Sequence, residues 1–187
     1  MRASPQRFYK GKPLIETDFF AGNGWLVELV RTGTSELILI HYKVDGTKWE
    51  SCFHVPYGES VLCPPVEDEI TRYVRFAHCV GHCGSAENYL QAIDSFLVRC
   101  LDLDQRYRFL LACFVLSTWV VDRLPVAPYV ALIGLPRSGK STALKALHLV
   151  CRRGMITSDI SSAAFYRACD RLTPTICIDE AATAGQK

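Results

Sequence analysis

Residues 129–147 read YVALIGLPRSGKSTALKAL, an apolar run that breaks at Gly134 and resumes as an amphipathic, lysine-bearing stretch. The apolar residues 129–133 predict a short buried strand, because the run is brief and rich in branched side chains. After Gly139 the apolar residues recur at helical spacing. We therefore expect a strand, a tight loop and a helix, in that order.

The loop between these two elements carries a phosphate-binding pattern. Residues 134–141 match GxxxxGK[ST] at every position. Glycines let successive backbone N–H groups turn inward around phosphate oxygens, and the N-terminus of the following helix adds partial positive charge. Lys140 is a compact cation for the β- and γ-phosphates, and the Ser141 hydroxyl is a hard oxygen ligand for Mg²⁺. The predicted nucleotide site comprises Gly134, Leu135, Pro136, Arg137, Ser138, Gly139, Lys140, Ser141 and Thr142.

A second motif follows a short apolar run near the end of the chain. Residues 175–178, Thr-Ile-Cys-Ile, predict a buried strand that ends on Asp179 and Glu180. Taken alone, an apolar run followed by two acids is more often an exposed strand end. After a complete phosphate-binding loop, the pair predicts that Asp179 supports the Mg²⁺ ion and that Glu180 polarises the attacking water. Two acids with separate tasks favour hydrolysis over simple nucleotide transport.

The order of elements predicts the fold class. Residues 154–157 predict a strand, and the stretch after it a helix capped by Ser158 or Ser161. Strands that alternate with helices are joined by right-handed crossovers and run parallel. We expect an α/β fold: an incomplete P-loop NTPase parallel sheet, preceded by a helical lead-in and a small N-terminal β-meander. The predicted domains are a β-rich unit (1–63), the helical lead-in (64–127) and the N-terminal part of the NTPase domain (128–187).

The first half of the chain shows strand patterns followed by helix patterns. Residues 25–55 predict a three-stranded meander, with Asp45-Gly46 as a hairpin turn. We expect three helices next: one over about 66–77 that ends at Gly81 or Gly84, one with Ser85 as N-cap, and one with Asp102 or Asp104 as N-cap that runs to about Asp122.

Composition restricts the class of protein. The net charge of +2 is too small to indicate nucleic acid by itself, although residues 128–187 hold eight Lys/Arg against four Asp/Glu. Nine cysteines, several within apolar runs, indicate buried thiols of a reducing compartment. The start of the chain lacks a signal-peptide pattern, and the uncharged stretch 109–121 is too short to span a bilayer. We expect a cytoplasmic protein without a membrane partner.

Four possible zinc ligands lie close together in AHCVGHCG. They are His78, Cys79, His82 and Cys83. Gly81 interrupts the helix that would space them, and four ligands so close in sequence make a poor tetrahedron around one ion. We therefore favour a helix end with packed thiols over a zinc site.

Three stretches resemble the ATPase and helicase-like proteins of phage, plasmids and integrated mobile elements, which are often paired with primase modules. These are YLQAIDSFLVRCLDL before the third helix, LLACFVLSTWVVDRLPVAPYVALIGLPRSGKSTAL through that aromatic-rich helix and the loop, and ISSAAFYRACDRLTPTICIDEAAT through the paired acids. The likeness covers about residues 88–184. The short gap between the two motifs is also similar to that of superfamily III helicases and related AAA+ proteins.

The resemblance implies an ATP-driven motor that acts on DNA in replication, as a homo-oligomeric ring. By matching positions, Lys140 and Ser141 bind Mg-ATP, Asp179 supports the metal and Glu180 is the catalytic base. The family's later motifs, including a sensor strand and an arginine finger, have no counterpart before Lys187, so we expect a chain truncated after the paired acids.

Two other functions compete with the ATPase hypothesis. A chain without an arginine finger would bind nucleotide better than it hydrolyses it, because that residue is worth about 10³–10⁵ in rate. The alternative is therefore a nucleotide-binding interaction module without useful catalysis. A small-molecule kinase is less favoured, since the paired acids and the helical lead-in argue against it.

Overall fold

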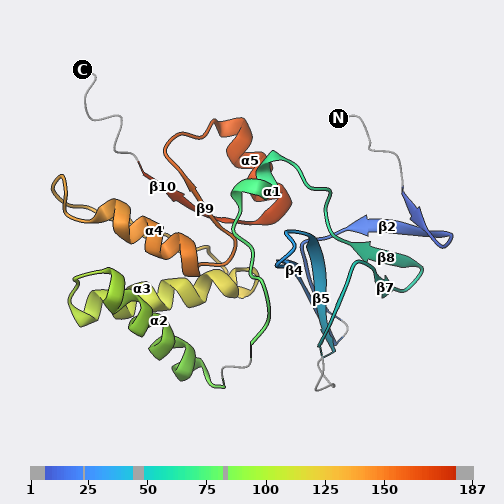
Figure 1. Ribbon diagram of the computed structural model, residues 1–187, viewed down its shortest axis with the longest axis horizontal. Helices are drawn as coiled ribbons and strands as arrows, with labels where there is room; N and C mark the ends of the chain where they lie inside the picture. Colours follow the sequence, from blue (N-terminus) through green and yellow to red (C-terminus); the bar gives the residue numbers. More distant parts are fainter. Residues whose placement is uncertain (1–6, 23, 44–48, 82–83, 180–187) are drawn as a thin grey trace. The chain divides into compact units, whose positions relative to one another are not determined.

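The computed structural model describes residues 7–22, 24–43, 49–81 and 84–179. These residues form two compact units (Figure 1). Unit 1 comprises residues 1–71 and 76–80, and unit 2 comprises residues 72–75 and 81–187. The division into three domains predicted from the sequence stays a prediction. Within the described ranges, no helix combines the length and the apolar character that crossing a bilayer requires.

Unit 1 contains two four-stranded sheets. An antiparallel meander runs in the order β3 (Phe19–Gly22), β4 (Trp25–Arg31), β5 (Leu37–Lys43) and β6 (Trp49–Cys52). The second sheet has the order β1 (Phe8–Tyr9), β2 (Lys12–Glu16), β8 (Ser60–Cys63) and β7 (Val55–Tyr57), with β2 and β8 parallel.

The meander contains three strands in the predicted region and adds β3 in front of them, but the third strand ends at Cys52, and Val55, predicted to continue it, belongs to β7 of the other sheet. Its β4 and β5 are joined over seven residue pairs, from Trp25 opposite Lys43 to Arg31 opposite Leu37. Branched side chains such as Val27 and Leu39 are almost fully buried, as expected for a sheet that packs its face on a core. The predicted Asp45-Gly46 turn lies outside the described residues.

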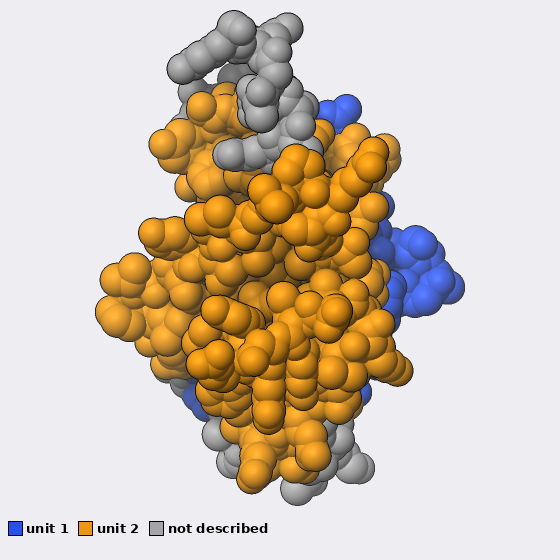
Figure 2. Space-filling model, turned by 90° about the vertical axis from the view of Figure 1, so that its left-hand side faces the viewer, with its two compact units in different colours: residues 1–71, 76–80 blue, residues 72–75, 81–187 orange. Residues whose placement is uncertain are grey.

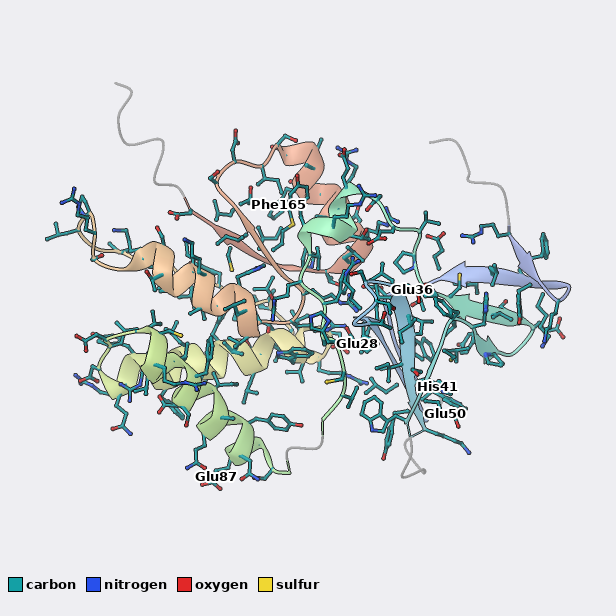
Figure 3. All side chains as sticks on the ribbon, in the orientation of Figure 1. Glu28, Glu36, His41, Glu50, Glu87 and Phe165 are labelled. Atoms are coloured by element: carbon teal, nitrogen blue, oxygen red, sulfur yellow. The ribbon has the colours of Figure 1, made fainter. Side chains whose placement is uncertain are left out.

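Cross-strand pairs and an arginine stabilise unit 1 further. His41 of β5 lies opposite Glu50 of β6, and 3.6 Å separates His41 Nε2 from Glu50 Oε2 (Figure 3). Arg31, at the end of β4, donates to the Thr71 carbonyl at 3.0 Å and pairs with Glu67. These contacts fix the chain after the second sheet against the meander.

The first predicted helix is much shorter than expected. It is α1 (Glu69–Tyr73), although the apolar spacing continued to residue 77. Arg75 instead forms an isolated antiparallel bridge with Gly154, in which the Arg75 N–H donates to the Gly154 carbonyl at 2.8 Å. A backbone N–H that bonds another segment cannot continue a helix, so the bridge ends α1 early.

Unit 2 is mainly helical. Its elements are α2 (Ala86–Cys100), α3 (Gln105–Trp119), the 3₁₀ helix η1 (Val121–Arg123), α4 (Lys140–Val150), β9 (Gly154–Thr157), α5 (Ser162–Leu172) and β10 (Thr175–Ile178). The N-caps Ser85, Asp104 and Ser161 each accept a hydrogen bond from a backbone N–H of the first helical turn, which confirms three predicted helix starts.

The core of unit 2 lies where α2, α3 and α4 meet β10. Its buried members are Leu97, Leu101, Leu111, Val115, Ala143, Ala146, Leu147, Cys151 and Cys177. Hydrogen bonds also connect the helices around this core. Arg108 of α3 donates to Asp94 of α2 at 2.9 Å, and the Trp119 indole N–H donates to the Val150 carbonyl at the end of α4 at 3.1 Å.

The predicted P-loop parallel sheet is wrong for the described chain. The strand order shows two small four-stranded sheets in unit 1 and one parallel pair, β9 with β10, in unit 2. The expected strand at 129–133 is irregular, and Tyr129 and Ile133 are 90% and 94% exposed. A parallel strand is stabilised by pairing with neighbouring strands. This run pairs with neither β9 nor β10, although Leu132 packs against the core of unit 2. The fold is a mixture of small antiparallel and mixed sheets with helices.

Candidate functional site

The predicted phosphate-binding loop forms a tight turn in front of α4. The Ser138 N–H donates to the Leu135 carbonyl at 3.2 Å, which closes a four-residue turn with Pro136 in its second position. Arg137, in the third position, has φ 64°. Proline second and a positive φ third are the signature of a type II turn. The loop is therefore folded back on itself before the helix begins.

The two glycines of the pattern meet different requirements. Gly139 is the N-cap of α4 and has φ 88°, a conformation that glycine adopts at low cost. At Gly134 a Cβ atom would lie 2.7 Å from Ser138 Oγ, a hydroxyl that rotation about the serine Cα–Cβ bond can move away. The backbone conformation therefore requires glycine at position 139 more strictly than at position 134.

The Lys140 ammonium group lies inside the loop. Its Nζ donates to the carbonyls of Gly134 at 2.8 Å and Leu135 at 2.7 Å, and Ser138 Oγ is 3.4 Å away. The lysine thus bonds oxygen atoms of its own loop. An ammonium has three donors, so phosphate oxygens could replace these carbonyls one for one.

The N-terminus of α4 offers amides to an anion. The Gly139 N-cap makes no side-chain hydrogen bond, and the helix continues through Ser141 and Thr142, with the Ala143 N–H bonding the Gly139 carbonyl. The amides before Ala143 come too early in the helix to have a partner within it, and they carry the positive end of its dipole. Such helix ends bind phosphate readily.

Asp179 reaches the same cavity as the loop. It follows β10 directly, and its N–H donates to the Thr157 carbonyl of β9 at 2.9 Å. The cavity has a volume of about 1240 Å³. Gly134, Lys140, Ser141 and Asp179 all line it. Figure 2 looks onto the end of unit 2 that carries the loop and shows a hollow near the middle of this surface. The predicted metal ligands, Ser141 and Asp179, therefore both line this cavity.

Most predicted site residues line this cavity, and two differ. Leu135 is not among the residues that line the cavity: its carbonyl oxygen accepts a hydrogen bond from Lys140, and its side chain is exposed. Glu180, the predicted catalytic base, lies outside the described residues. The remaining residues, Pro136, Arg137, Ser138, Gly139 and Thr142, line the cavity together with the loop lysine.

No family model, curated protein or solved structure matches this chain.

The walls of the cavity include residues that no sequence motif identified. Phe114 and Thr118 of α3 line it, as do Thr173 and Ile176. Phe114 lies twenty residues before the loop begins, and no local pattern links it to the loop. It reaches the cavity because it packs against the core that α2, α3, α4 and β10 share.

Two cysteines beside this region are poor nucleophiles. Burial raises the pKa of Cys177, on the cavity wall, to about 11. Burial, with a smaller contribution from the nearby Cys177, raises the pKa of Cys151 to about 12. Both thiols are therefore protonated at neutral pH, and covalent chemistry through a thiolate is disfavoured at these two positions.

The alternative zinc site gains no support from the described residues. His78 Nδ1 lies 2.9 Å from the Arg31 carbonyl oxygen, so this ring nitrogen already has a partner. His82 and Cys83 lie outside the described ranges. Across residues 7–22, 24–43, 49–81 and 84–179, no group of three or more His, Cys, Asp or Glu side chains could hold a metal ion.

Proposed function

We propose that the loop 134–142 binds the phosphates of Mg-ATP, and that the chain is the ATP-binding and hydrolysing module of a DNA helicase or primase-helicase. One observation carries the proposal. Lys140, the uncapped start of α4 and Asp179 all line one cavity. A cation, helix amides and an acid in a shared space suit a triphosphate and its metal ion.

The donor set fits Mg-ATP. Lys140 and the first amides of α4 would hold phosphate oxygens. The Ser141 hydroxyl and the Asp179 carboxylate are oxygen donors, which Mg²⁺ prefers. Bound Mg²⁺ would neutralise phosphate charge, and Glu180 would serve as the base for the attacking water. The resemblance to helicase-like proteins of mobile elements further supports DNA as a partner and a homo-oligomeric ring as the assembly.

A matched pair of lysine variants tests nucleotide binding. Lys140→Ala removes the ammonium inside the loop, whereas Lys145→Ala removes an exposed lysine one turn further along the same helix. We expect isothermal titration with Mg-ATP to show at least about a tenfold loss of affinity for Lys140→Ala, since a hydrogen bond to a charged group contributes roughly 1.5–3 kcal/mol. We expect Lys145→Ala to bind like the parent chain.

Unchanged ATP affinity in Lys140→Ala would refute the proposed site. Phosphate release by the parent chain, measured with and without DNA, tests the second half of the proposal. If the chain binds ATP but releases no phosphate under either condition, the hydrolysis half of the proposal is wrong. The chain would then be the nucleotide-binding interaction module that the sequence offers as the alternative.

A further inference from the structure

The helix α3 of unit 2 carries apolar residues on two opposite faces. One face holds Leu111 and Val115, which belong to the buried core of unit 2. The other face is open to solvent, and its residues recur at a spacing of alternately four and three. We call this face the α3 stripe, and its members are Arg106, Leu110, Cys113, Ser117 and the C-cap Val120, with Phe109 beside Leu110. A helix that is apolar all round is normally buried, so we expect the stripe to be covered by a partner.

Most of the α3 stripe is exposed in the single chain. Phe109 is 56% exposed and Leu110 is 61% exposed. Cys113 and Val120 are exposed as well. A hollow of about 440 Å³ opens at the N-terminal half of the helix, lined by Gln105, Arg106, Phe109 and Leu110. Neighbouring apolar side chains that are left in water mark an interaction surface.

The stripe is complementary in shape to itself when two copies pack with α3 antiparallel. Its N-terminal half holds the large side chains Phe109 and Leu110, and its C-terminal half holds the smaller Ser117 and Val120. A two-fold axis at Cys113 places the large half of one copy on the small half of the other, so that the side chains interdigitate. The Ser117 hydroxyl already donates within its own helix at 2.6 Å, so covering it leaves no unsatisfied donor.

The charges of α3 favour the same antiparallel arrangement. Arg106, at the N-terminal end of the stripe, pairs with Asp104, yet its side chain is 84% exposed. The last turn of α3 contains no basic residue, and Arg123, which follows the helix, pairs with Asp122 at 3.3 Å. The carbonyls at the C-terminal end of a helix carry partial negative charge and attract cations. Antiparallel packing brings the Arg106 of each copy to this end of the other.

We propose that the α3 stripe binds the α3 stripe of a second copy of this chain, antiparallel about a two-fold axis near Cys113. The face matches itself in both shape and charge, which favours a second copy over an unrelated partner. A helix of 15 residues offers less area than the roughly 800 Å² per partner of a standard interface, so the dimer is weak. This closed two-fold contact differs from the head-to-tail contacts of a ring, and it is independent of the nucleotide site.

Analytical ultracentrifugation of the full chain, at micromolar to millimolar concentrations, tests self-association. We expect an equilibrium of monomer and dimer in the parent chain. Leu110→Lys places a charge inside the contact and should weaken the dimer by at least about tenfold. Leu149→Lys is the matched control, because it makes the same change at a 45% exposed leucine of α4, and it should dimerise like the parent.

Cross-linking with a short bis-maleimide, which joins two thiols, locates the two-fold axis. The exposed Cys113 should couple to its counterpart in the second copy. We expect Cys113→Ser to lose this cross-linked dimer. Cys100→Ser removes an exposed thiol from α2 instead and should keep it.

A second cross-linking experiment tests the antiparallel orientation. In the Cys113→Ser background, Arg106→Cys and Val120→Cys should couple when the two variants are mixed, because antiparallel packing brings these two positions together. Neither variant should couple above the background when it is tested alone. Coupling of each variant with itself would show parallel packing and overturn the proposed arrangement.

Two further results would overturn the proposal. A parent chain that stays monomeric up to millimolar concentration would mean that another protein, or a further segment of the chain, covers the stripe. A dimer that folded Leu110→Lys does not weaken would place the contact elsewhere, and thermal unfolding checks that this variant is folded. Lys140→Ala should lose ATP and keep the dimer, so that either this proposal or the nucleotide site can fail while the other holds.

Discussion

Thr118 links two segments of unit 2 through one hydroxyl group. Its Oγ1 donates to the Val115 carbonyl of the same helix at 2.7 Å and accepts from the Arg152 N–H at 3.0 Å. The residue is only 7% exposed. A buried N–H that loses its acceptor cannot turn to water, so this bond matters more than its average net contribution.

We expect Thr118→Val to lower the free energy of unfolding by about 1–3 kcal/mol, because valine keeps the shape and leaves the Arg152 N–H unsatisfied. Thr118→Ser keeps the hydroxyl and should retain most of the stability. Urea unfolding of both variants measures the difference. Equal stability of the valine and serine variants would show that the hydroxyl is not needed.

At the scale of elements, the contact of α4 with β9 depends on a residue without a side chain. A Cβ atom on Gly154 would lie 2.2 Å from the His148 carbonyl oxygen and 3.0 Å from its carbon. Both are backbone atoms, so no side-chain rotation can relieve the overlap. Glycine at this position therefore allows the start of β9 to pass close to the backbone of α4.

We expect Gly154→Ala to destabilise unit 2 by about 1–3 kcal/mol, since overpacking forces backbone shifts of this cost. Gly81→Ala is the matched control, because nothing lies within 4 Å of its added Cβ and its φ is not positive. Chemical unfolding followed by circular dichroism compares the two. A Gly154→Ala chain as stable as the control would mean that α4 and β9 can separate without cost.

Elements with local causes could be predicted from the sequence. Ser85, Asp104 and Ser161 cap helices because a side-chain oxygen meets an N–H two or three residues later, and the sequence displays that spacing. The prediction of a strand at 129–133 was wrong, because a strand forms only when it can pair with the edge of another strand. The five residues of the run do not show whether such a partner strand is present.

The candidate site also has a part that could be predicted from the sequence and a part that could not. The loop 134–142 could be located because its causes are local: Gly139 has a positive φ, and Pro136 occupies the second position of the turn. Its cavity walls could not be predicted. Phe114 and Thr118 reach the cavity from α3 through packing over a long sequence separation. Such contacts leave no periodicity or spacing to recognise.

At the scale of the whole molecule, unit 2 presents an apolar run to solvent beside its candidate site. The run includes Tyr129, Ile133 and Leu135, which are all almost fully exposed. Apolar side chains stabilise a fold in proportion to the area they remove from water, and these remove little. The run should therefore affect the surface properties of the protein more than its stability.

We expect the double variant Ile133→Ser, Leu135→Ser to change the free energy of unfolding by no more than about 0.5 kcal/mol, as for other exposed positions. Leu147→Ser, in the buried core of the same unit, should cost several kcal/mol, roughly 2–5, because it leaves a cavity and a buried hydroxyl. Urea unfolding measures both. Binding of an apolar dye should fall in the double variant. A large loss of stability there would contradict the exposed placement of the run.

The hydrogen bond from Trp119 to the end of α4 also provides an optical reporter. The sequence has three tryptophans, and the other two, Trp25 and Trp49, belong to unit 1. Once those two are replaced by phenylalanine, ultraviolet emission comes from a single indole that touches the helix whose opposite end carries Lys140. Events at the loop can then be followed by intrinsic fluorescence, without attaching a dye.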